Sequence, residues 1–406
     1  MCGAESAHVA TMRNNSRALL GSCVLTGALV ATLLTSAASL TGTTRSAPER
    51  IEDGRIYGMP AAEVFREDYS GPPVTGDAVT FLPHVAPLAP GNRTHEIRID
   101  VLVQDIEVAP GVRFNAWTFG GTVPGPVVHV REGDRVVFTM KNRSNEAVPV
   151  SEPTRGAAPF FRHLAESGQT RTPSAVLPMP HSIDFHSAML APDDKYRMIA
   201  PGESIRFNWV ANYPGVYMYH CGTPPVLTHV AMGQYGIVIV SPKDGYPTDK
   251  QVAREFAVVQ SEFYLKKGAG ELHVLDTEAA HRKLPSQVAF NGHVNALKER
   301  PLIADVGDRV RLYLHNFGPN DGASSHVVGT IFDRVWYEGN LQNEWRGMQT
   351  VALGASNGAV VEFVVPEAGE YLLVDHEFAD AQKGAVGRIR VGSPGAHTAH
   401  RTRMEH

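Results

Sequence analysis

The residues around Cys221 combine one thiol with four imidazoles at spacings that suit copper. His220 precedes Cys221 and His229 follows it, while His181 and His186 form a second pair upstream. Two imidazoles and one thiolate, from His181, Cys221 and His229, make the trigonal ligand set of a blue-copper site. Because successive side chains of a strand point to opposite faces, His220 and His186 are left for a second metal. The peptide bond between His220 and Cys221 would then give electrons a short covalent path between two metals.

A blue-copper site also takes a weak axial donor, which tunes its reduction potential. Two candidates follow His229: Met232 offers a thioether, and Gln234 offers a carbonyl oxygen. In a strand, an offset of two residues moves a side chain about 7 Å along the same face. The residue types alone leave the choice open. If no metal were bound, Cys221 would be an ordinary buried apolar residue, but a lone cysteine flanked by histidines is more typical of a ligand or nucleophile.

Three neutral imidazoles with an open coordination position are typical of a catalytic metal centre. His186 and His220 supply two, and His376 is the third candidate because it aligns with His220 in an internal repeat. Taken alone, His376 would read as an isolated strand histidine. Asp184 and His326 are candidate proton donors for an anion at this centre. Taken alone, they would read as a surface carboxylate and a hydrogen-bonded core histidine.

The composition is that of a turn-rich globular protein with room for two domains. The chain has 406 residues, 43% of them hydrophobic, and 38 glycines. Its formal net charge of −5, without a long basic run, gives no electrostatic reason to expect a nucleic-acid partner. Cys2 and Cys23 lie before or within an N-terminal apolar stretch, so its removal would leave Cys221 alone and exclude a disulfide within the chain.

The N-terminal apolar stretch predicts export. Residues 18–40 are uncharged and follow Arg13 and Arg17, which is the pattern of a signal peptide. The stretch is also long enough to cross a bilayer as an uncleaved anchor. Both interpretations place the folded part outside the cytoplasm, in the periplasm or another extracytoplasmic space.

Short β-rich segments separated by Gly and Pro turns predict an all-β protein of Greek-key sandwiches or barrels. The second half of the chain repeats the plan of the first. Residues 306–312 echo 132–138, and residues 369–376 echo 215–220. Glu377 stands where the first half has Cys221, so the second half cannot build a thiolate site. Strands are expected at residues 95–103, 127–130, 135–141, 204–210, 215–220, 236–240 and 256–263.

These patterns divide the chain into five parts, which are listed here. They are a signal peptide or anchor at 1–43, a linker and irregular lead-in at 44–92, a first β domain at 93–245, a second β domain at 251–393, and a disordered tail at 394–406. Residues 145–177 form a polar insertion in the first domain, and we expect a surface loop near the metals there.

Several of these segments resemble the copper-containing nitrite reductases. The resemblance runs over about residues 94–391 and is carried by residues 181–186, 219–236, 325–329 and 374–384. It implies two tandem cupredoxin-like domains, two coppers per chain and, usually, a homotrimer. The type 1 copper ligands that it implies are His181, Cys221 and His229. The type 2 copper ligands that it implies are His186, His220 and His376, with His376 reaching across a subunit interface. The catalytic pair that it implies is Asp184 and His326.

One departure from the family concerns the axial ligand. The family has Met five residues after the second type 1 histidine, and this chain has Gln234 there, whereas Met232 comes two residues too early. The resemblance therefore favours Gln234. A glutamine oxygen would favour Cu(II) over Cu(I) and lower the potential.

The activity that the resemblance implies is one-electron reduction of nitrite to nitric oxide, with two protons consumed and a small redox protein as electron donor. A laccase-like copper oxidase is one rival, but its three-copper cluster needs paired His-x-His motifs, which the two domains lack. A non-enzymatic blue-copper electron carrier is another, and it would be favoured if the three-histidine site stayed empty. Asp184, His326 and His376 argue against the carrier.

Overall fold

Short strands dominate the computed structural model, which describes residues 55–88, 91, 93–150 and 172–392. These residues all belong to one compact unit of the chain, Arg45–His406. Within the described residues the strands form five sheets, and the few helices are short. The all-β prediction is therefore confirmed.

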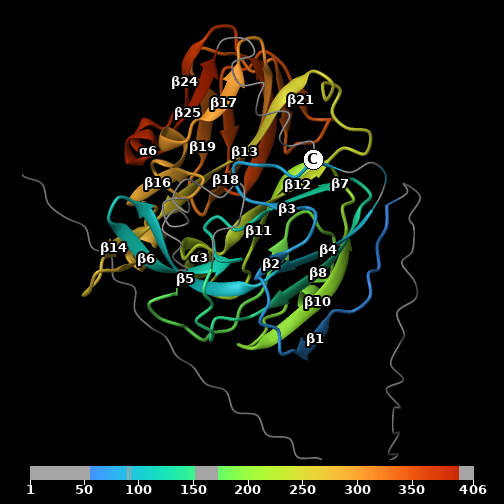
Figure 1. Cartoon of the computed structure of the whole chain (residues 1–406), viewed down its shortest axis with the longest axis vertical. Coiled ribbons are helices and arrows are strands. Elements are labelled where there is room, and N and C mark those ends of the chain that lie inside the picture. Colours follow the sequence, from blue (N-terminus) through green and yellow to red (C-terminus); the bar gives the residue numbers. More distant parts are fainter. Residues whose placement is uncertain (1–54, 89–90, 92, 151–171, 393–406) are drawn as a thin grey trace, which may run out of the picture. The chain divides into compact units, whose positions relative to one another are not determined.

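Two five-stranded sheets are built from the first half of the chain (Figure 1). Apolar side chains of both sheets, among them Phe138, Phe207 and Val238, fill one core between them. In spatial order the first sheet contains β1 (Glu63–Arg66), β10 (Glu203–Val210), β8 (Arg135–Lys141), β4 (Thr94–Ile99) and β2 (Val74–Thr75). The second contains β3 (Val79–Thr80), β7 (Val127–Arg131), β12 (Tyr235–Ser241), β11 (Gly215–His220) and β9 (Asp184–Phe185).

Two further sheets come from the second half and enclose a core of their own, which includes Leu312, Phe363 and Ile389. The six-stranded sheet contains β16 (Gln287–Phe290), β13 (Val252–Phe263), β18 (Arg309–Gly318), β23 (Asn357–Val364), β20 (Arg334–Tyr337) and β21 (Glu344–Trp345). The five-stranded sheet contains β17 (Leu302–Asp305), β25 (Val386–Gly392), β24 (Gly369–Asp375), β19 (Ala323–Val327) and β22 (Val351–Leu353).

The strand orders of the two halves correspond. The order β7-β12-β11-β9 has its counterpart in β17-β25-β24-β19, and in each set the first pair is parallel. In the same way β4 pairs with β8 in parallel, as β13 does with β18. His220 ends β11, and His376 directly follows its counterpart β24. The division into two domains at 245–251 stays an interpretation of this duplication.

A third core joins the two halves. Along β12, Ile237 and Ile239 belong to this shared core, while Val238 and Val240 belong to the core of the first half. Side chains of a strand alternate in this way, so a strand that is buried on both faces is apolar throughout. The two halves are thus packed together over an apolar surface.

The remaining elements lie at the edges of these layers. A four-stranded sheet combines both halves, because β15 pairs in parallel with β6. It contains β14 (Leu265–Lys267), β15 (His273–Leu275), β6 (Val112–Phe119) and β5 (Val101–Ala109). The helices are α2 (Pro192–Lys195), α3 (Val226–Ala231), α4 (Thr277–His281), α5 (Ala296–Glu299) and α6 (Phe378–Lys383).

The lead-in to the first half is more ordered than its composition predicts. The described residues before 93 contribute β1, β2 and β3, which extend the first two sheets. β1 pairs with β10, and Asn212 accepts a hydrogen bond from the backbone of Ile56 at 3.1 Å. Such short edge strands carry little periodicity, because most of their contacts are with strands far away in sequence.

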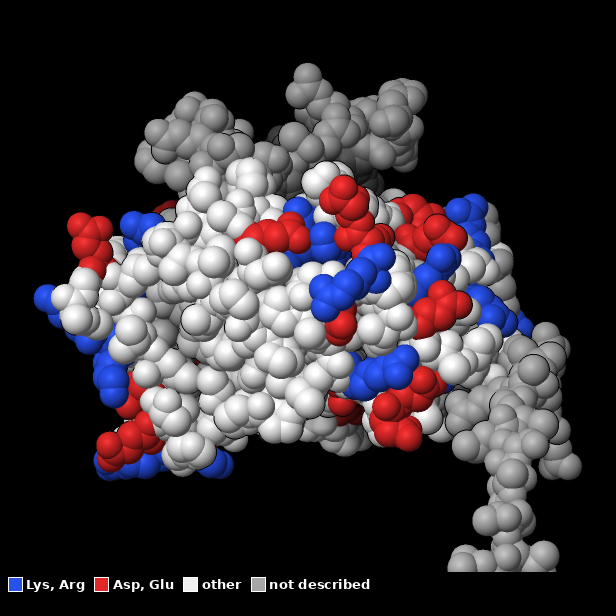
Figure 2. Space-filling model, turned by 90° about the horizontal axis from the view of Figure 1, so that it is seen from below, with Lys and Arg blue, Asp and Glu red and all other residues white. Residues whose placement is uncertain are grey.

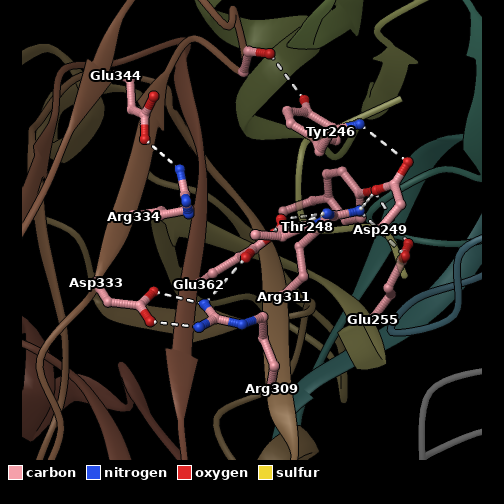
Figure 3. Close-up of polar contacts among 12 residues, drawn as sticks. Tyr246, Thr248, Asp249, Glu255, Arg309, Arg311, Asp333, Arg334, Glu344 and Glu362 are labelled. Atoms are coloured by element: carbon pink, nitrogen blue, oxygen red, sulfur yellow. Dashed lines mark hydrogen bonds and ion pairs between the residues drawn. The ribbon is translucent and has the colours of Figure 1, made fainter. Parts of the chain in front are cut away.

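A buried ion-pair network includes Thr248 and Asp249, which lie in the domain boundary that the sequence predicts at 245–251 (Figure 3). Arg311 on β18 is buried and lies 2.7 Å from Glu362 on β23 and 2.7 Å from Asp249. Thr248 donates a hydrogen bond of 2.7 Å to Glu362. Arg311 and Glu362 form the buried charge pair, and the connecting segment joins it through the hydroxyl of Thr248 and the half-exposed carboxylate of Asp249. These contacts attach the segment to the second half.

Three predictions fall on residues outside the described ranges. They concern the signal peptide or anchor at 1–43, the centre of the insertion at 145–177, and the tail at 394–406. Within the described ranges, no helix has the length and apolar character needed to cross a membrane.

Candidate metal centres

The thiol of Cys221 lies at the centre of a buried group of donor atoms. Its Sγ is 3.2 Å from Nδ1 of His229 and 4.0 Å from Nδ1 of His181. One donor atom from each of the three side chains lies within 4.8 Å of the others, and all three residues are buried. A thiolate with two imidazoles is a soft donor set that suits copper, so these residues fit that metal. We call them the thiolate cluster.

Three different elements bring the thiolate cluster together. Cys221 directly follows β11, and His229 lies on α3. His181 is held by a two-way backbone pairing with Ile199, with hydrogen bonds of 3.2 and 2.8 Å. The backbone N–H of Cys221 donates to the carbonyl of Gln234 at 3.1 Å, which closes the loop that carries α3.

The surroundings of Cys221 favour its thiolate form. Burial by itself raises the pKa of the Cys221 thiol, but hydrogen bonds with His181 and His229 outweigh it and bring the pKa to about 5. The backbone N–H of Ser182 also donates to Sγ at 3.4 Å. The thiolate is the metal-binding form of cysteine, so at neutral pH this side chain is ready to bind a cation.

The side-chain oxygen of Gln234 reaches the thiolate cluster. Oε1 of Gln234 lies 3.0 Å from Nδ1 of His229, and Gln234 is completely buried. Its Nε2 has no hydrogen-bond partner within the described structure. A buried amide nitrogen without a partner costs free energy. The contact between the amide oxygen and His229 has to offset this cost.

Met232 lies on the other side of this loop. Its side chain packs against the core shared by the two halves, whereas Cys221 belongs to the core of the first half. The strand spacing assumed for this segment is wrong, because residues 226–231 form helix α3. Met232 ends the helix and Gly233, at φ 110°, reverses the chain so that Gln234 returns to Cys221. A Cβ at Gly233 would lie 2.5 Å from Val123, so only glycine fits there.

Trp117 completes the surroundings of the thiolate cluster, and sequence reasoning missed it. Its ring stands edge-on to His229 at a centroid distance of 4.8 Å and to His181 at 5.8 Å. The residue lies on β6, and its backbone N–H donates to the carbonyl of Met232 at 3.0 Å. Aromatic packing of this kind limits the rotation of both imidazoles and excludes water.

The second group of donors consists of His186, His220 and Asp184, and we call it the imidazole cluster. The Nε2 atoms of the two histidines are 3.1 Å apart, and Oδ2 of Asp184 lies 3.9 Å from Nε2 of His220. Strand register creates this arrangement, because Asp184 on β9 is paired with His220 on β11. His186 is exposed and His220 is half-buried.

The remaining ring nitrogens of these two histidines have partners of their own. Nδ1–H of His220 donates to the carbonyl of Cys221 at 2.9 Å. Nδ1 of His186 lies 3.1 Å from Oγ of Ser356, a residue of the second half. Such second partners fix the tautomer of a metal-binding histidine. Both Nε2 atoms are therefore the nitrogens that remain for a metal, and they face each other.

His326 and His376 form a separate pair in the second half. Their ring centroids are 5.1 Å apart, because β19 and β24 are neighbours and the backbone N–H of His376 donates to the carbonyl of Ser324 at 2.8 Å. Nδ1 of His326 contacts the carbonyl of Gln349. Neither histidine joins the imidazole cluster within one chain. The structure therefore does not bring His376 to His186 and His220.

Two exposed apolar residues lie close in sequence to the pair of His326 and His376, and one of them packs against it. Phe378 is 66% exposed and packs edge-on against His376 at 5.2 Å, and Val328 is 45% exposed. Two more exposed apolar residues are close in sequence to ligands of the thiolate cluster: Val226 begins α3, which carries His229, and Met198 precedes Ile199, the backbone partner of His181. Figure 2 shows one face of the molecule with a wide area free of charged side chains. A lack of charged residues is typical of the core of a protein–protein interface.

Comparisons with known proteins place the chain. A family profile described as multicopper oxidase matches residues 101–152. A copper-containing nitrite reductase of Neisseria meningitidis serogroup A is 36% identical over 327 residues, which cover 79% of this chain and 75% of the relative. The chain belongs to the copper-containing nitrite reductase family. The resemblance seen in the sequence is confirmed.

Solved structures of this family have the same fold. A copper nitrite reductase from Nitrosomonas europaea matches with a TM-score of 0.59 and 32% identity, over 75% of this chain and 94% of that one. A copper-containing nitrite reductase from Thermus scotoductus SA-01 matches with a TM-score of 0.60 and 28% identity, over 74% of this chain and 62% of that one. A multicopper oxidase at 22% identity, with a TM-score of 0.57, shares the fold.

Proposed function

We propose that this chain is a copper-dependent nitrite reductase that forms nitric oxide. One observation carries the proposal: the two donor clusters are joined by the single peptide bond between His220 and Cys221. Bound copper supplies one-electron redox chemistry and a positive charge that attracts an anion. The balanced reaction consumes one electron and two protons per nitrite and releases water with nitric oxide.

The two clusters have different roles in this proposal. His181, Cys221 and His229 would hold a type 1 copper, and Oε1 of Gln234 would be its weak additional donor. Their buried thiolate suits a site that only accepts and passes on electrons. His186 and His220, with His376, bind a type 2 copper, which makes two coppers per chain. The exposure of His186 leaves this second site open to a substrate.

Asp184 and His326 handle the protons. The carboxylate of Asp184 is held by the β9–β11 register at 3.9 Å from Nε2 of His220, so it can hold a proton beside a bound anion. His326 lies next to His376, and among the described residues only its Nδ1 has a hydrogen-bond partner, the carbonyl of Gln349. One group from each half would thus face the substrate.

We further propose that the type 2 site is shared between subunits of a homotrimer. Within one chain, His326 and His376 stand apart from the imidazole cluster. The exposed apolar residues Phe378 and Val328 lie close to them in sequence, and a neighbouring subunit would cover these side chains. A partner contact there would bring His376 of one chain to His186 and His220 of the next.

Electrons would come from a small redox protein. The exposed apolar residues Met198 and Val226 are close in sequence to ligands of the thiolate cluster, and an apolar surface close to a redox site suits a transient electron-transfer contact. The apolar residues 18–40 favour export, so we place the reaction in the periplasm. A non-enzymatic electron carrier would leave the paired Nε2 atoms of His186 and His220 without a use.

The test combines metal analysis with a nitrite-dependent assay of nitric oxide. The native protein should hold two coppers per chain, show the visible thiolate charge-transfer colour and form nitric oxide from nitrite. Cys221→Ala should lose the colour and the donor-driven activity while it keeps the copper of the imidazole cluster. If the variant kept its colour, the thiolate assignment would be wrong. If the native protein formed no nitric oxide with both coppers bound, the proposed activity would be wrong.

A further inference from the structure

Ser356 has a backbone conformation that its side chain does not favour. It is the third residue of the turn 354–357 between β22 and β23, where the N–H of Asn357 donates to the carbonyl of Gly354 at 3.0 Å. Its φ of 67° lies in the left-handed region, which glycine adopts freely and serine does not. Turns with a positive φ at the third position usually have Gly or Asn there. A serine at this position therefore has to be explained.

The hydroxyl of Ser356 has a specific partner in the other half of the chain. Oγ lies 3.1 Å from Nδ1 of His186, 170 positions earlier in the sequence. The backbone N–H of Ser356 donates to the carbonyl of Asn316 at 2.7 Å, which anchors the turn to β18. The hydroxyl is thus presented to His186 from a fixed backbone, and a glycine here would relieve the strain but lose the contact.

The two histidines of the imidazole cluster differ in how they are held. Nδ1–H of His220 donates to a backbone carbonyl, that of Cys221, which no substitution can remove. His186 is exposed, and its ring is held through Nδ1 by a side chain alone. When Nδ1–H donates to Oγ of Ser356, Nε2 is left unprotonated and faces Nε2 of His220 at 3.1 Å.

We propose that Ser356 is the positioning residue for His186, and that the left-handed strain at Ser356 is kept because it fixes the tautomer and orientation of that imidazole. The inference builds on the proposed copper site at His186 and His220. It also gives the second half a role inside its own chain. Ser356 holds the imidazole of His186, and the partner's His376 would complete the ligand set to which that imidazole belongs. Strained backbone is typically retained where the site needs it.

The test compares Ser356→Gly and Ser356→Ala with the native protein, each as the full exported chain. Both variants lose the hydroxyl, but only glycine also removes the strain. Loss of a second partner typically weakens metal binding about 10–100-fold. We expect both to lose affinity for the type 2 copper by this factor, measured by competition with a chelator, and to show an altered type 2 signal in electron paramagnetic resonance. The type 1 colour should not change.

The melting temperature separates positioning from folding. Ser356→Gly should melt at the same temperature as the native protein or higher, although it binds the copper less tightly. Lys283→Gly is the matched control, because Lys283 also has a positive φ, 56°, and its amino group makes only a long ion pair with Asp321 at 3.8 Å. This control should not change copper binding.

Three results would overturn the inference. These are native copper affinity in both Ser356 variants, an unchanged type 2 signal, or an equal loss of affinity in Lys283→Gly. The proposed activity is judged by a different measurement. If the native protein formed no nitric oxide and Ser356→Gly still lost copper affinity, the activity would fail and the positioning role would stand.

Discussion

The proposed proton donors differ from the proposed ligands in their contacts: Asp184 lies in the imidazole cluster, and His326 lies beside His376. Asp184 lies 3.9 Å from His220. As a metal ligand it would have to compete with two imidazoles whose Nε2 atoms already face each other. His326 packs against His376, and among the described residues only its Nδ1 has a hydrogen-bond partner, the carbonyl of Gln349. We therefore assign proton transfer, and not metal binding, to Asp184 and His326.

Substitution at either position should affect turnover without affecting the metal. Asp184→Asn keeps the size and polarity of the side chain but cannot supply a proton, and His326→Ala removes the second donor. General acid–base catalysis is typically worth about 10²–10⁴-fold, and we expect losses in that range in nitrite turnover. Both coppers and the visible spectrum should remain. Asp193→Asn, an exposed aspartate on α2, serves as control.

Two outcomes would contradict this assignment. Near-native nitrite turnover in both variants would exclude them as proton donors. Complete loss of the type 2 copper in either variant would show that the residue is a ligand.

Residue type and spacing predicted part of the site and could not predict the rest. His181, Cys221 and His229 stand out because a thiol and imidazoles at these intervals are rare outside metal sites, and the structure gathers them. Trp117 and Ser356 do not stand out, because an aromatic residue or a serine has many uses. Their contacts depend on tertiary packing: Ser356 and His186 are 170 residues apart. The left-handed φ of Ser356 has no signature in a single sequence.

Helix α3 decides which side chain reaches the thiolate cluster. The family position favours Gln234 over Met232, on the assumption that the segment is a strand. The helix with the turn at Gly233 supports the same choice for a different reason, since Met232 packs into the core shared by the two halves. The helix itself was missed because six residues that include two β-branched valines, Val226 and Val230, carry little helical periodicity.

The axial donor can be tested through the reduction potential. Gln234→Met should raise the potential of the type 1 copper, because a thioether favours Cu(I) more than an amide oxygen does. Each ~59 mV of a one-electron couple corresponds to about 1.4 kcal/mol, so a moderate shift changes the direction of electron transfer between the coppers. Met232→Leu should leave the potential nearly unchanged. Spectroelectrochemistry of the visible band measures both, and the reverse pattern would reassign the ligand to Met232.

The repeated strands in the middle of the sheets could be predicted from the sequence, but the short strands at the sheet edges could not. The echo between residues 132–138 and 306–312 corresponds to β8 and β18, which hold equivalent places in their sheets. Strands β1, β2 and β3 were missed, because two to four residues are too short for alternation to be seen.

For the whole molecule, the decisive question is whether one chain can complete the three-histidine site. His376 lies outside the imidazole cluster of its own chain. A mixture of two inactive variants answers the question. His186→Ala removes one ligand of the pair His186 and His220, and His376→Ala removes the proposed third ligand. If the site is shared, a mixed trimer regains a working site wherever a subunit with intact His186 and His220 lies next to a subunit with intact His376.

The expected recovery can be calculated. Purification through both tags keeps only mixed trimers, and in each of them one of the three sites has an intact His186 next to an intact His376. About one third of the native nitrite turnover per chain should therefore return. The measurement uses co-expressed chains with two different tags, purified through both, with light scattering to verify three chains per particle. Each variant alone should be inactive. A mixture that stays as inactive as its components would place the whole site within one chain.

His186 and His220 are separated from His326 and His376 within one chain. This separation has a consequence for the order of metal binding and subunit assembly. A single folded chain holds the complete thiolate cluster but only two of the three imidazoles. If the type 2 site is shared between subunits as proposed, such a chain could acquire colour and exchange electrons before it meets another copy of itself, but it could not turn over nitrite until it does. Activity per chain would then follow mass action, and on dilution it should fall while the colour per chain stays constant. The cell would hold two populations of the same polypeptide, an electron carrier and an enzyme, in proportions set by its concentration.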